Sequence, residues 1–272
     1  MIPTNTLRSA LPAICILLLA TVTGCGGSDS DAPDSAAPEA GGTPADTASA
    51  DQAAPAAAIA GIVGTATLNG DVPERTELET GSDPKCSVMH EDEPLLSDRA
   101  IISENGGIKD VFVYIKNPPE GDYAPPAEQA VIDQIGCRYV PHVLGVMTGQ
   151  EISVENSDPT LHNVRGIARS NRPFNNSQPE GAKPRIKKFD KAEMGIRLKC
   201  DIHPWMTAFI FAMDHPFFAV SDDTGAFAIT GLPDGEYTVV AWHEKYGEQE
   251  GTATFTEGAA TTLDFSFEPT ED

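Results

Sequence analysis

Side chains that bind metal ions are crowded into one short stretch of the chain. Cys200, His203 and Met206 offer a thiol, an imidazole and a thioether within seven residues, in the run Cys-Asp-Ile-His-Pro-Trp-Met. A second imidazole, His162, stands upstream in the run His-Asn-Val. Two His, one Cys and a weak Met form the ligand set of a blue-copper electron-transfer centre. The soft sulfur atoms favour Cu(I), and imidazole tolerates both oxidation states of copper.

Each of these side chains also has an ordinary structural explanation. Met206 could be a core residue, Cys200 a buried free thiol and His203 a surface histidine. Zinc or an empty site are the alternatives to copper, although zinc prefers another Cys or a carboxylate to a Met. The remaining histidines are expected in a strand, as for the spare candidate ligand His142, or at the surface, as for His90, His215 and His243.

Short strands separated by turns must position these side chains. Residues 151–155 alternate, with Ile152 and Val154 inward, and residues 208–213 are apolar throughout, as in a central strand covered on both faces. The spacing of 8–12 residues between strands predicts an all-β sandwich or barrel. The other expected strands are 61–70, 111–116, 217–221, 226–230, 237–242 and 261–267, and the one expected helix is 127–134.

The metal-binding runs resemble the cupredoxins, most closely their amicyanin and plastocyanin branch. Cys-x-x-His-Pro-x-Met is similar to the amicyanin ligand loop, and His-Asn-Val to the strand end that bears the other His. The resemblance implies a Greek-key sandwich with one type 1 copper ion. It implies His162, Cys200 and His203 as equatorial ligands and Met206 as the axial ligand. It also implies that Asn163 hydrogen-bonds across to the ligand loop, while Pro204 favours extended backbone at His203 and so stiffens the loop.

A second resemblance covers roughly the last 55 residues. The pattern Asp-x-x-Gly-x-Phe-x-Ile-x-x-Leu-Pro-x-Gly-x-Tyr-x-Val, which begins at Asp222, resembles the carboxypeptidase regulatory-like fold, a transthyretin-type sandwich related to carbohydrate-binding-like folds. We therefore expect a cupredoxin-like domain over 61–215 and a smaller sandwich over 216–272. The strand at 61–70 is a candidate to return and complete the smaller sandwich, which would make the cupredoxin-like part an insertion.

The N-terminus has the pattern of an export signal. Arg8 precedes an apolar run that is too short to span a bilayer, and Val22-Thr-Gly-Cys25 resembles the lipobox of bacterial lipoproteins. The resemblance implies cleavage after residue 24, lipid on Cys25 and, from Gly26, an outer-membrane destination; an ordinary signal peptide is the alternative. Residues 25–60 are rich in Ala, Pro, Gly, Ser and Asp, which predicts a disordered tether.

Charge and cysteine content limit the function classes. The net charge of -23 argues against a nucleic-acid binder, because phosphates are gripped by clustered Lys and Arg. Export implies an oxidising compartment, so we expect Cys86 to pair with Cys137 and Cys200 to stay apart as a ligand. Closing that loop would contribute about 4 kcal/mol on the chain-entropy model. The basic residues within 165–199 form either a solvated loop or a docking patch for an acidic redox partner.

The sequence therefore predicts an exported, membrane-tethered protein that binds one copper ion and carries electrons. The alternative is a non-redox binding or scaffold module whose C-terminal sandwich engages a glycan or a protein. A catalyst is the least favoured class, because the sequence has no Ser-His-Asp or Walker pattern and no second metal site beside the first.

Overall fold

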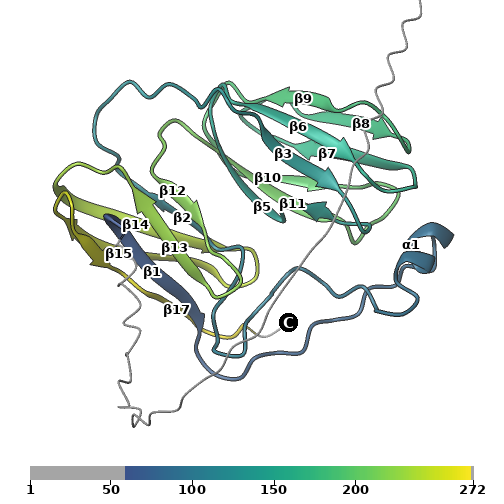
Figure 1. Ribbon diagram of the computed structural model, residues 1–272, viewed down its shortest axis with the longest axis horizontal. Coiled ribbons are helices and arrows are strands. Elements are labelled where there is room, and N and C mark those ends of the chain that lie inside the picture. The colour runs from purple at the N-terminus through teal and green to yellow at the C-terminus, as the bar shows by residue number, and fades with distance from the viewer. Residues whose placement is uncertain (1–58, 271–272) are drawn as a thin grey trace, which may run out of the picture. The chain divides into compact units, whose positions relative to one another are not determined.

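The computed structural model describes residues 59–270. The predicted signal peptide, the lipobox with Cys25 and all but the last two residues of the tether lie outside the described residues. Within 59–270 the structure contains no helix with the length and apolar character needed to cross a membrane. Nearly all of its regular structure is β, as predicted, and the strands build two β-sandwiches (Figure 1).

The first sandwich, which we call the terminal sandwich, combines the two ends of the described chain. Its first strand, β1 (Gly61–Leu68), pairs antiparallel with β13 (Ala226–Thr230) and parallel with β16 (Ala260–Thr262) and β17 (Phe265–Phe267). One sheet contains β13, β1, β16 and β17. The other contains β12 (Phe218–Val220), β2 (Phe112–Ile115), β14 (Gly235–His243) and β15 (Gly247–Phe255). The return of the first strand to the C-terminal sandwich is thus confirmed.

The second sandwich lies between β2 and β12 in the chain, and we call it the inserted sandwich. One sheet contains β5 (Val143–Met147), β11 (Thr207–Met213), β10 (Glu193–Lys199), β7 (His162–Ile167) and β8 (Phe174–Gln178). The other contains β4 (Tyr139–Val140), β3 (Ala130–Gln134), β6 (Glu151–Asn156) and β9 (Arg185–Lys188). The β5–β11 and β3–β6 pairs are parallel, and the other pairs in these two sheets are antiparallel.

Strand β11 confirms the expectation of a strand covered on both faces. Ala208, Ile210 and Ala212 face the core of the inserted sandwich. Phe211 and Met213, on the opposite face, join a separate apolar cluster that includes residues of β2, β12 and β14. The two sandwiches are therefore packed together through an apolar contact rather than joined only by the chain.

Two expectations about local structure and boundaries were wrong. The helix expected over 127–134 is instead strand β3, where Ile132 is fully buried and the backbone pairs in parallel with β6. Two adjacent β-branched residues, Val131 and Ile132, favour this conformation. The boundary at 61–215 is also not followed by the sheets, because β1 and β2 belong with the C-terminal strands.

Residues 69–110, which we call the covering segment, connect β1 with β2. The segment contains the helix α1 (Pro84–Met89), with Asp83 as the N-cap and Pro84 in the first turn, both favourable at a helix start. The predicted disulfide is present and joins Cys86 of α1 to Cys137 of the inserted sandwich. The covering segment is therefore fixed covalently against the end of the inserted sandwich where His162 begins β7.

Candidate metal centre

The two metal-binding runs meet because β7 and β10 are neighbours in one sheet. Lys199, the last residue of β10, pairs with Arg165 of β7, so the end of one strand lies beside the start of the other. His162 begins β7, and Cys200 follows β10 directly. The loop from Cys200 to Met206 then leads into β11, the other neighbour of β10. This topology brings together residues that are about forty positions apart in the sequence.

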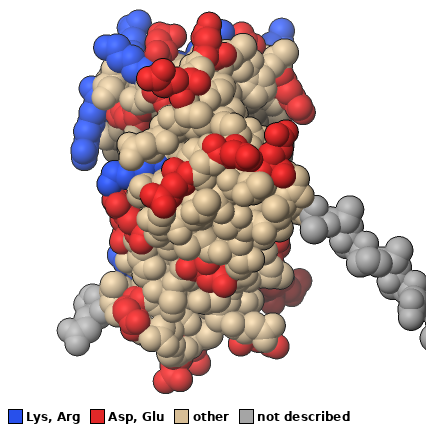
Figure 2. Space-filling view, turned by 90° about the vertical axis from the view of Figure 1, so that its left-hand side faces the viewer, with Lys and Arg blue, Asp and Glu red and all other residues tan. Residues whose placement is uncertain are grey.

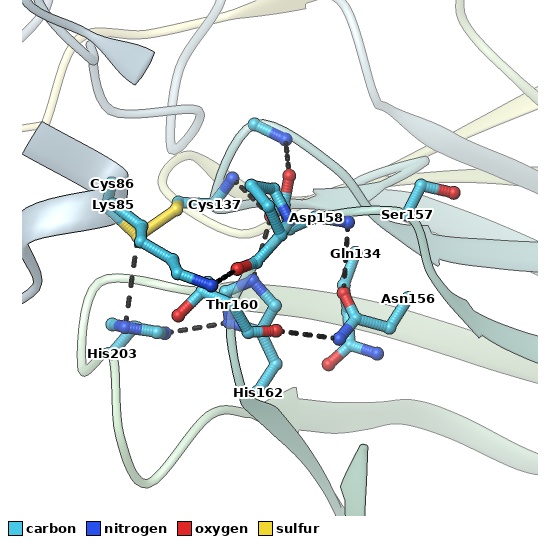
Figure 3. Close-up of polar contacts among 12 residues, drawn as sticks. Lys85, Cys86, Gln134, Cys137, Asn156, Ser157, Asp158, Thr160, His162 and His203 are labelled. Atoms are coloured by element: carbon cyan, nitrogen blue, oxygen red, sulfur yellow. Dashed lines mark hydrogen bonds and ion pairs between the residues drawn. A yellow bond between two sulfur atoms is a disulfide. The ribbon is translucent and has the colours of Figure 1, made fainter. Parts of the chain in front are cut away.

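Three of the predicted ligands converge on one point. His162, Cys200 and His203 each place one potential ligand atom within 4.8 Å of the others, and all three residues are buried. The Nδ1 atoms of the two imidazoles are 2.8 Å apart (Figure 3). Nδ1 of His203 is 3.8 Å from Sγ of Cys200. The cluster offers one thiolate and two imidazoles, a donor set that suits a copper or zinc ion.

The loop that bears Cys200 and His203 is closed by its own backbone. The N–H of His203 donates to Sγ of Cys200 at 3.3 Å, and the N–H of Met206 donates to the carbonyl of His203 at 2.9 Å. The N–H of Cys200 donates to the carbonyl of Met206 at 3.3 Å. Met206 is buried in the apolar cluster that also contains Cys200, whereas Pro204 is exposed at the outside of the loop.

Asn163 links β7 to this loop. Its Oδ1 accepts the N–H of Asp201 at 2.7 Å and lies 3.4 Å from Sγ of Cys200. Its amide nitrogen donates to Asn175 of β8 at 2.7 Å. The side chain therefore spans from the strand that bears the first imidazole to the residues that follow the thiol.

Two carboxylates lie behind the imidazoles. Nε2 of His162 is 2.8 Å from Oδ2 of Asp158, and Nε2 of His203 is 2.9 Å from Oδ2 of Asp83. The oxygens of Asp158 also accept the N–H groups of Gly136 and Cys137. Because a carboxylate only accepts, both imidazoles donate from Nε2, and hydrogen bonds of this kind orient metal-binding histidines.

When both imidazoles are neutral, this arrangement leaves two Nδ1 atoms facing each other without a proton between them. In neutral imidazole the nitrogen opposite the N–H carries a lone pair, so His162 and His203 direct two lone pairs at each other across 2.8 Å. Such a contact is relieved by one shared proton or by a cation bound to both nitrogens. The geometry of the donor set therefore fits a metal ion at this point.

The pKa shifts agree with a site prepared for positive charge. Burial raises the pKa of the Cys200 thiol, but its hydrogen bonds with His162 and His203 outweigh burial and lower the pKa to about 6. Burial lowers the pKa of His162, but Asp158 and Cys200 together raise it to about 9. For Asp83, the hydrogen bonds from His203 and from the α1 backbone outweigh burial and lower the pKa to about 2. Thiolate and carboxylate both predominate at neutral pH.

The covering segment closes the site. His203 is completely buried, and Sγ of Cys86 lies 3.8 Å from its Nε2. The ring of Trp205 lies 5.0 Å from the His203 ring, and its indole N–H donates to the carbonyl of Cys137 at 3.0 Å. The disulfide and the indole therefore lie between the imidazole of His203 and solvent.

The two carboxylates were not among the residues predicted for the site. Asp158 stands four residues before His162, and this short separation could have indicated a contact between the two side chains. Asp83 followed by Pro84 has the pattern of a helix start, but nothing in the sequence connects it with a residue 120 positions away. The two oxygens of Asp83 have different partners: Oδ1 caps α1, and Oδ2 accepts a hydrogen bond from His203.

The other histidines do not join the cluster. Expectations of surface positions for His215 and His243 were wrong, because both are buried beneath the terminal sandwich's aromatic residues. His90 is half-buried, with Nε2 3.0 Å from the carbonyl of Gly136. His142 lies just before β5 and pairs with Glu244.

The basic residues within 165–199 lie on and between β7, β8, β9 and β10. Arg165 pairs with Asp201 at 3.4 Å, and Nζ of Lys187 lies 4.5 Å from the centre of the Phe174 ring. On the face drawn in Figure 2, Asp and Glu are spread widely, whereas Lys and Arg gather along one upper edge. On this face, therefore, the positive charge is concentrated near the upper left and the negative charge is not.

No protein-family model and no curated protein matches the chain. Among solved structures, a Cu-containing nitrite reductase from Thermus scotoductus SA-01 is similar at 19% identity, over 36% of this chain and 26% of that chain, with a TM-score of 0.31. An oxidised mutant of amicyanin is similar at 17% identity, over 37% of this chain and 97% of that chain, with a TM-score of 0.29. A purple cupredoxin from Nitrosopumilus maritimus is similar at 19% identity, over 30% of this chain and 98% of that chain, with a TM-score of 0.27. The chain thus spans about a quarter of the length of the nitrite reductase that it matches.

Proposed function

We propose that the chain is an exported, lipid-anchored protein that binds one type 1 copper ion and carries single electrons. The observation that supports this most strongly is the buried convergence of His162, Cys200 and His203, with both Nδ1 atoms turned inward by carboxylates on Nε2. When bound, copper would supply a one-electron couple between Cu(I) and Cu(II).

The donor set favours copper over zinc. Structural zinc sites are completed by a further Cys, His or carboxylate, whereas the remaining sulfur in this loop is the thioether of Met206. Thioether and thiolate are soft ligands that suit Cu(I). We therefore assign His162, Cys200 and His203 as the strong ligands and Met206 as the weak one.

The residues around the ligands would restrict their movement. Asn163 ties Asp201 and Cys200 to β7, and the backbone bonds of the loop fix His203 relative to Cys200. Both imidazoles are held from behind by Asp83 and Asp158. An electron carrier gains from such rigidity, because little rearrangement then accompanies a change of oxidation state.

The membrane anchor in this proposal depends on the lipobox at residues 22–25 and the tether that follows it. Lipid on Cys25 would hold the folded part at the cell envelope, where a redox partner protein would reach it. Replacing Cys25 by Ser should move the protein from the membrane fraction to the soluble fraction. An unchanged distribution would contradict the anchor without affecting the copper site.

Copper titration of the chain that carries Cys25→Ser tests the metal assignment. We expect one copper ion per chain and an intense visible band from thiolate-to-copper charge transfer. Cys200→Ser should abolish the band, whereas the matched control His90→Gln should retain it, because His90 lies outside the cluster. A colourless, redox-silent complex would instead support the non-redox binding module.

A further inference from the structure

A cavity of about 450 Å³ opens beside the candidate metal centre. Trp205 and Met206 of the ligand loop form one part of its wall, and residues of the covering segment and of β10 form others. This volume lies within the range of small-molecule sites. The cavity adjoins the metal cluster: the proposed weak ligand Met206 lines it, whereas His162, Cys200 and His203 do not.

Three arginines from different parts of the chain line this cavity: Arg99, Arg138 and Arg197. Alternation along β10 buries Ile196 and Leu198 in the core, so Arg197 points away from that core, beside its cross-strand neighbour Phe209. Three arginines around one cavity are unusual in a chain with a net charge of -23.

The carboxylates in the cavity wall already have cationic partners. Asp98 accepts from Arg75 at 2.9 Å and from Arg138 at 2.5 Å, and Glu244 pairs with His142. Neither Arg99 nor Arg197 has a carboxylate within 4.0 Å among residues 59–270. Two of the three arginines that line the cavity therefore have no ion-pair partner in the described part of the chain.

A second observation comes from His142, which also lines the cavity. Its side chain is only 9% exposed. Its Nε2 contacts Glu244, but its buried Nδ1 has no hydrogen-bond partner among the described residues. A buried polar atom without a partner is costly, and in native proteins it often marks a place where a ligand or a water molecule binds.

We propose that this cavity binds a small organic anion that carries carboxylate or phosphate groups. Arginine presents a planar fork of donors that matches both kinds of oxyanion, and Arg99 and Arg197 are free to supply it. The anion would lie against Trp205, whose other neighbour is the His203 ring at 5.0 Å. A bound anion would therefore sit one side chain away from the metal cluster.

Anion titration of the metal-free chain tests the proposal without reference to copper. Citrate and inorganic phosphate serve as carboxylate and phosphate probes, glycerol as a neutral control, and calorimetry with tryptophan fluorescence as readouts. We expect one citrate or phosphate per chain and a fluorescence change that disappears in Trp205→Phe, since Trp242 does not line the cavity. The probe that binds more tightly identifies the preferred oxyanion.

Arginine variants test whether Arg99 and Arg197 bind the anion. R99Q/R197Q should weaken binding about tenfold or more, and R197K should weaken it less, because lysine keeps the charge but loses the fork. The matched control Arg185→Gln removes an exposed arginine of β9 outside the cavity and should change the affinity less than about twofold.

Three results would overturn the proposal: no binding of either anion up to about 10 mM, equal affinity in R99Q/R197Q, or an equal loss in Arg185→Gln. None of them would affect the copper assignment, because the titration contains no metal.

Discussion

The two sandwiches of this chain are built from similar strands but differ in the side chains that they bury. The core of the terminal sandwich is built from side chains such as Ile62, Val239 and Phe267, all fully buried and apolar. The inserted sandwich instead buries polar groups at one end, among them Gln134, whose amide donates to Gln178 and to the carbonyl of Glu155. Burial of polar groups costs free energy unless they are bonded to one another. Both sandwiches bury some polar groups, since the terminal sandwich contains His215 and His243, but the inserted sandwich gathers several bonded ones beside the proposed ligands.

The largest loss in the free energy of unfolding should follow from removing a buried side chain in the core of the terminal sandwich. Phe267→Ala removes a fully buried ring and should lower the free energy of unfolding by about 3 to 5 kcal/mol. Copper binding under native conditions should remain, since Phe267 belongs to a different core from Cys200. Denaturant unfolding and copper titration measure the two effects. Loss of copper binding in a variant that is still folded would show that the copper site depends on the core of the terminal sandwich.

Removing the disulfide should have the next largest effect. The double variant Cys86→Ser/Cys137→Ser releases a constraint between residues 51 positions apart and should lower the free energy of unfolding by about 4 kcal/mol. Reduction of the unmodified protein should give the same loss, measured by denaturant unfolding. A stability unchanged by either treatment would mean that noncovalent contacts alone hold the covering segment.

Replacing the carboxylates behind the imidazoles should change copper affinity, which is a property of the inserted sandwich. Asp83→Asn and Asp158→Asn should each lower copper affinity about 10- to 100-fold, because each carboxylate accepts through both oxygens, whereas the uncharged amide keeps one acceptor and replaces the other by an NH2 donor. Competition with a chelator of known affinity measures this. Asp122→Asn, at an exposed position of the chain, is the matched control and should leave affinity unchanged. Equal losses in all three variants would indicate a general charge effect.

The smallest effect concerns the pH dependence of the metal-free protein. The raised pKa of His162, about 9, gives stability that is complete below pH 6.5 and is lost as pH rises toward 9. The lowered pKa of Cys200, about 6, gives stability that is complete above pH 9 and is lost as pH falls toward 6. These two slopes oppose each other and largely cancel between pH 6.5 and 9, so stability should fall only gently with rising pH, through His203 and His142, whose pKa values are also raised.

Cys200→Ser removes one of these slopes. Stability of the metal-free variant should then fall with rising pH, by at most about 1.4 kcal/mol per pH unit, as long as Asp158 keeps the pKa of His162 raised. Thermal unfolding across this pH range measures both proteins. A steep pH dependence in the unmodified protein, or none in the variant, would contradict the proposed ion pair of thiolate and imidazole.

Much of the fold could be predicted from alternation along the chain. The pattern of residues 151–155 gave strand β6 with Ile152 and Val154 buried, as expected. Residues 261–267 were expected as one strand, but the structure divides them into β16 and β17, both paired with β1. Alternation identifies strands but not their partners, so the placement of β2 in the terminal sandwich could not be predicted from the sequence.

The candidate site was predictable to the extent that its residues are close in sequence. Cys200, His203 and Met206 lie in one loop, and the run His-Asn-Val marked the other strand end. Asp83 comes from the covering segment, and it reaches His203 through the position of α1 and the disulfide. Such a contact depends on how separate segments pack, which the types and spacing of residues do not encode locally.

X-ray absorption at the copper edge, on the chain loaded with one equivalent of copper, tests the central claim most directly. We predict two nitrogen neighbours and one sulfur neighbour at short distance around the metal, with the short sulfur signal lost in Cys200→Ser and only the weaker, longer contact of the Met206 thioether left. A spectrum without a sulfur neighbour in the unmodified protein, or copper held equally well without Cys200, would contradict it.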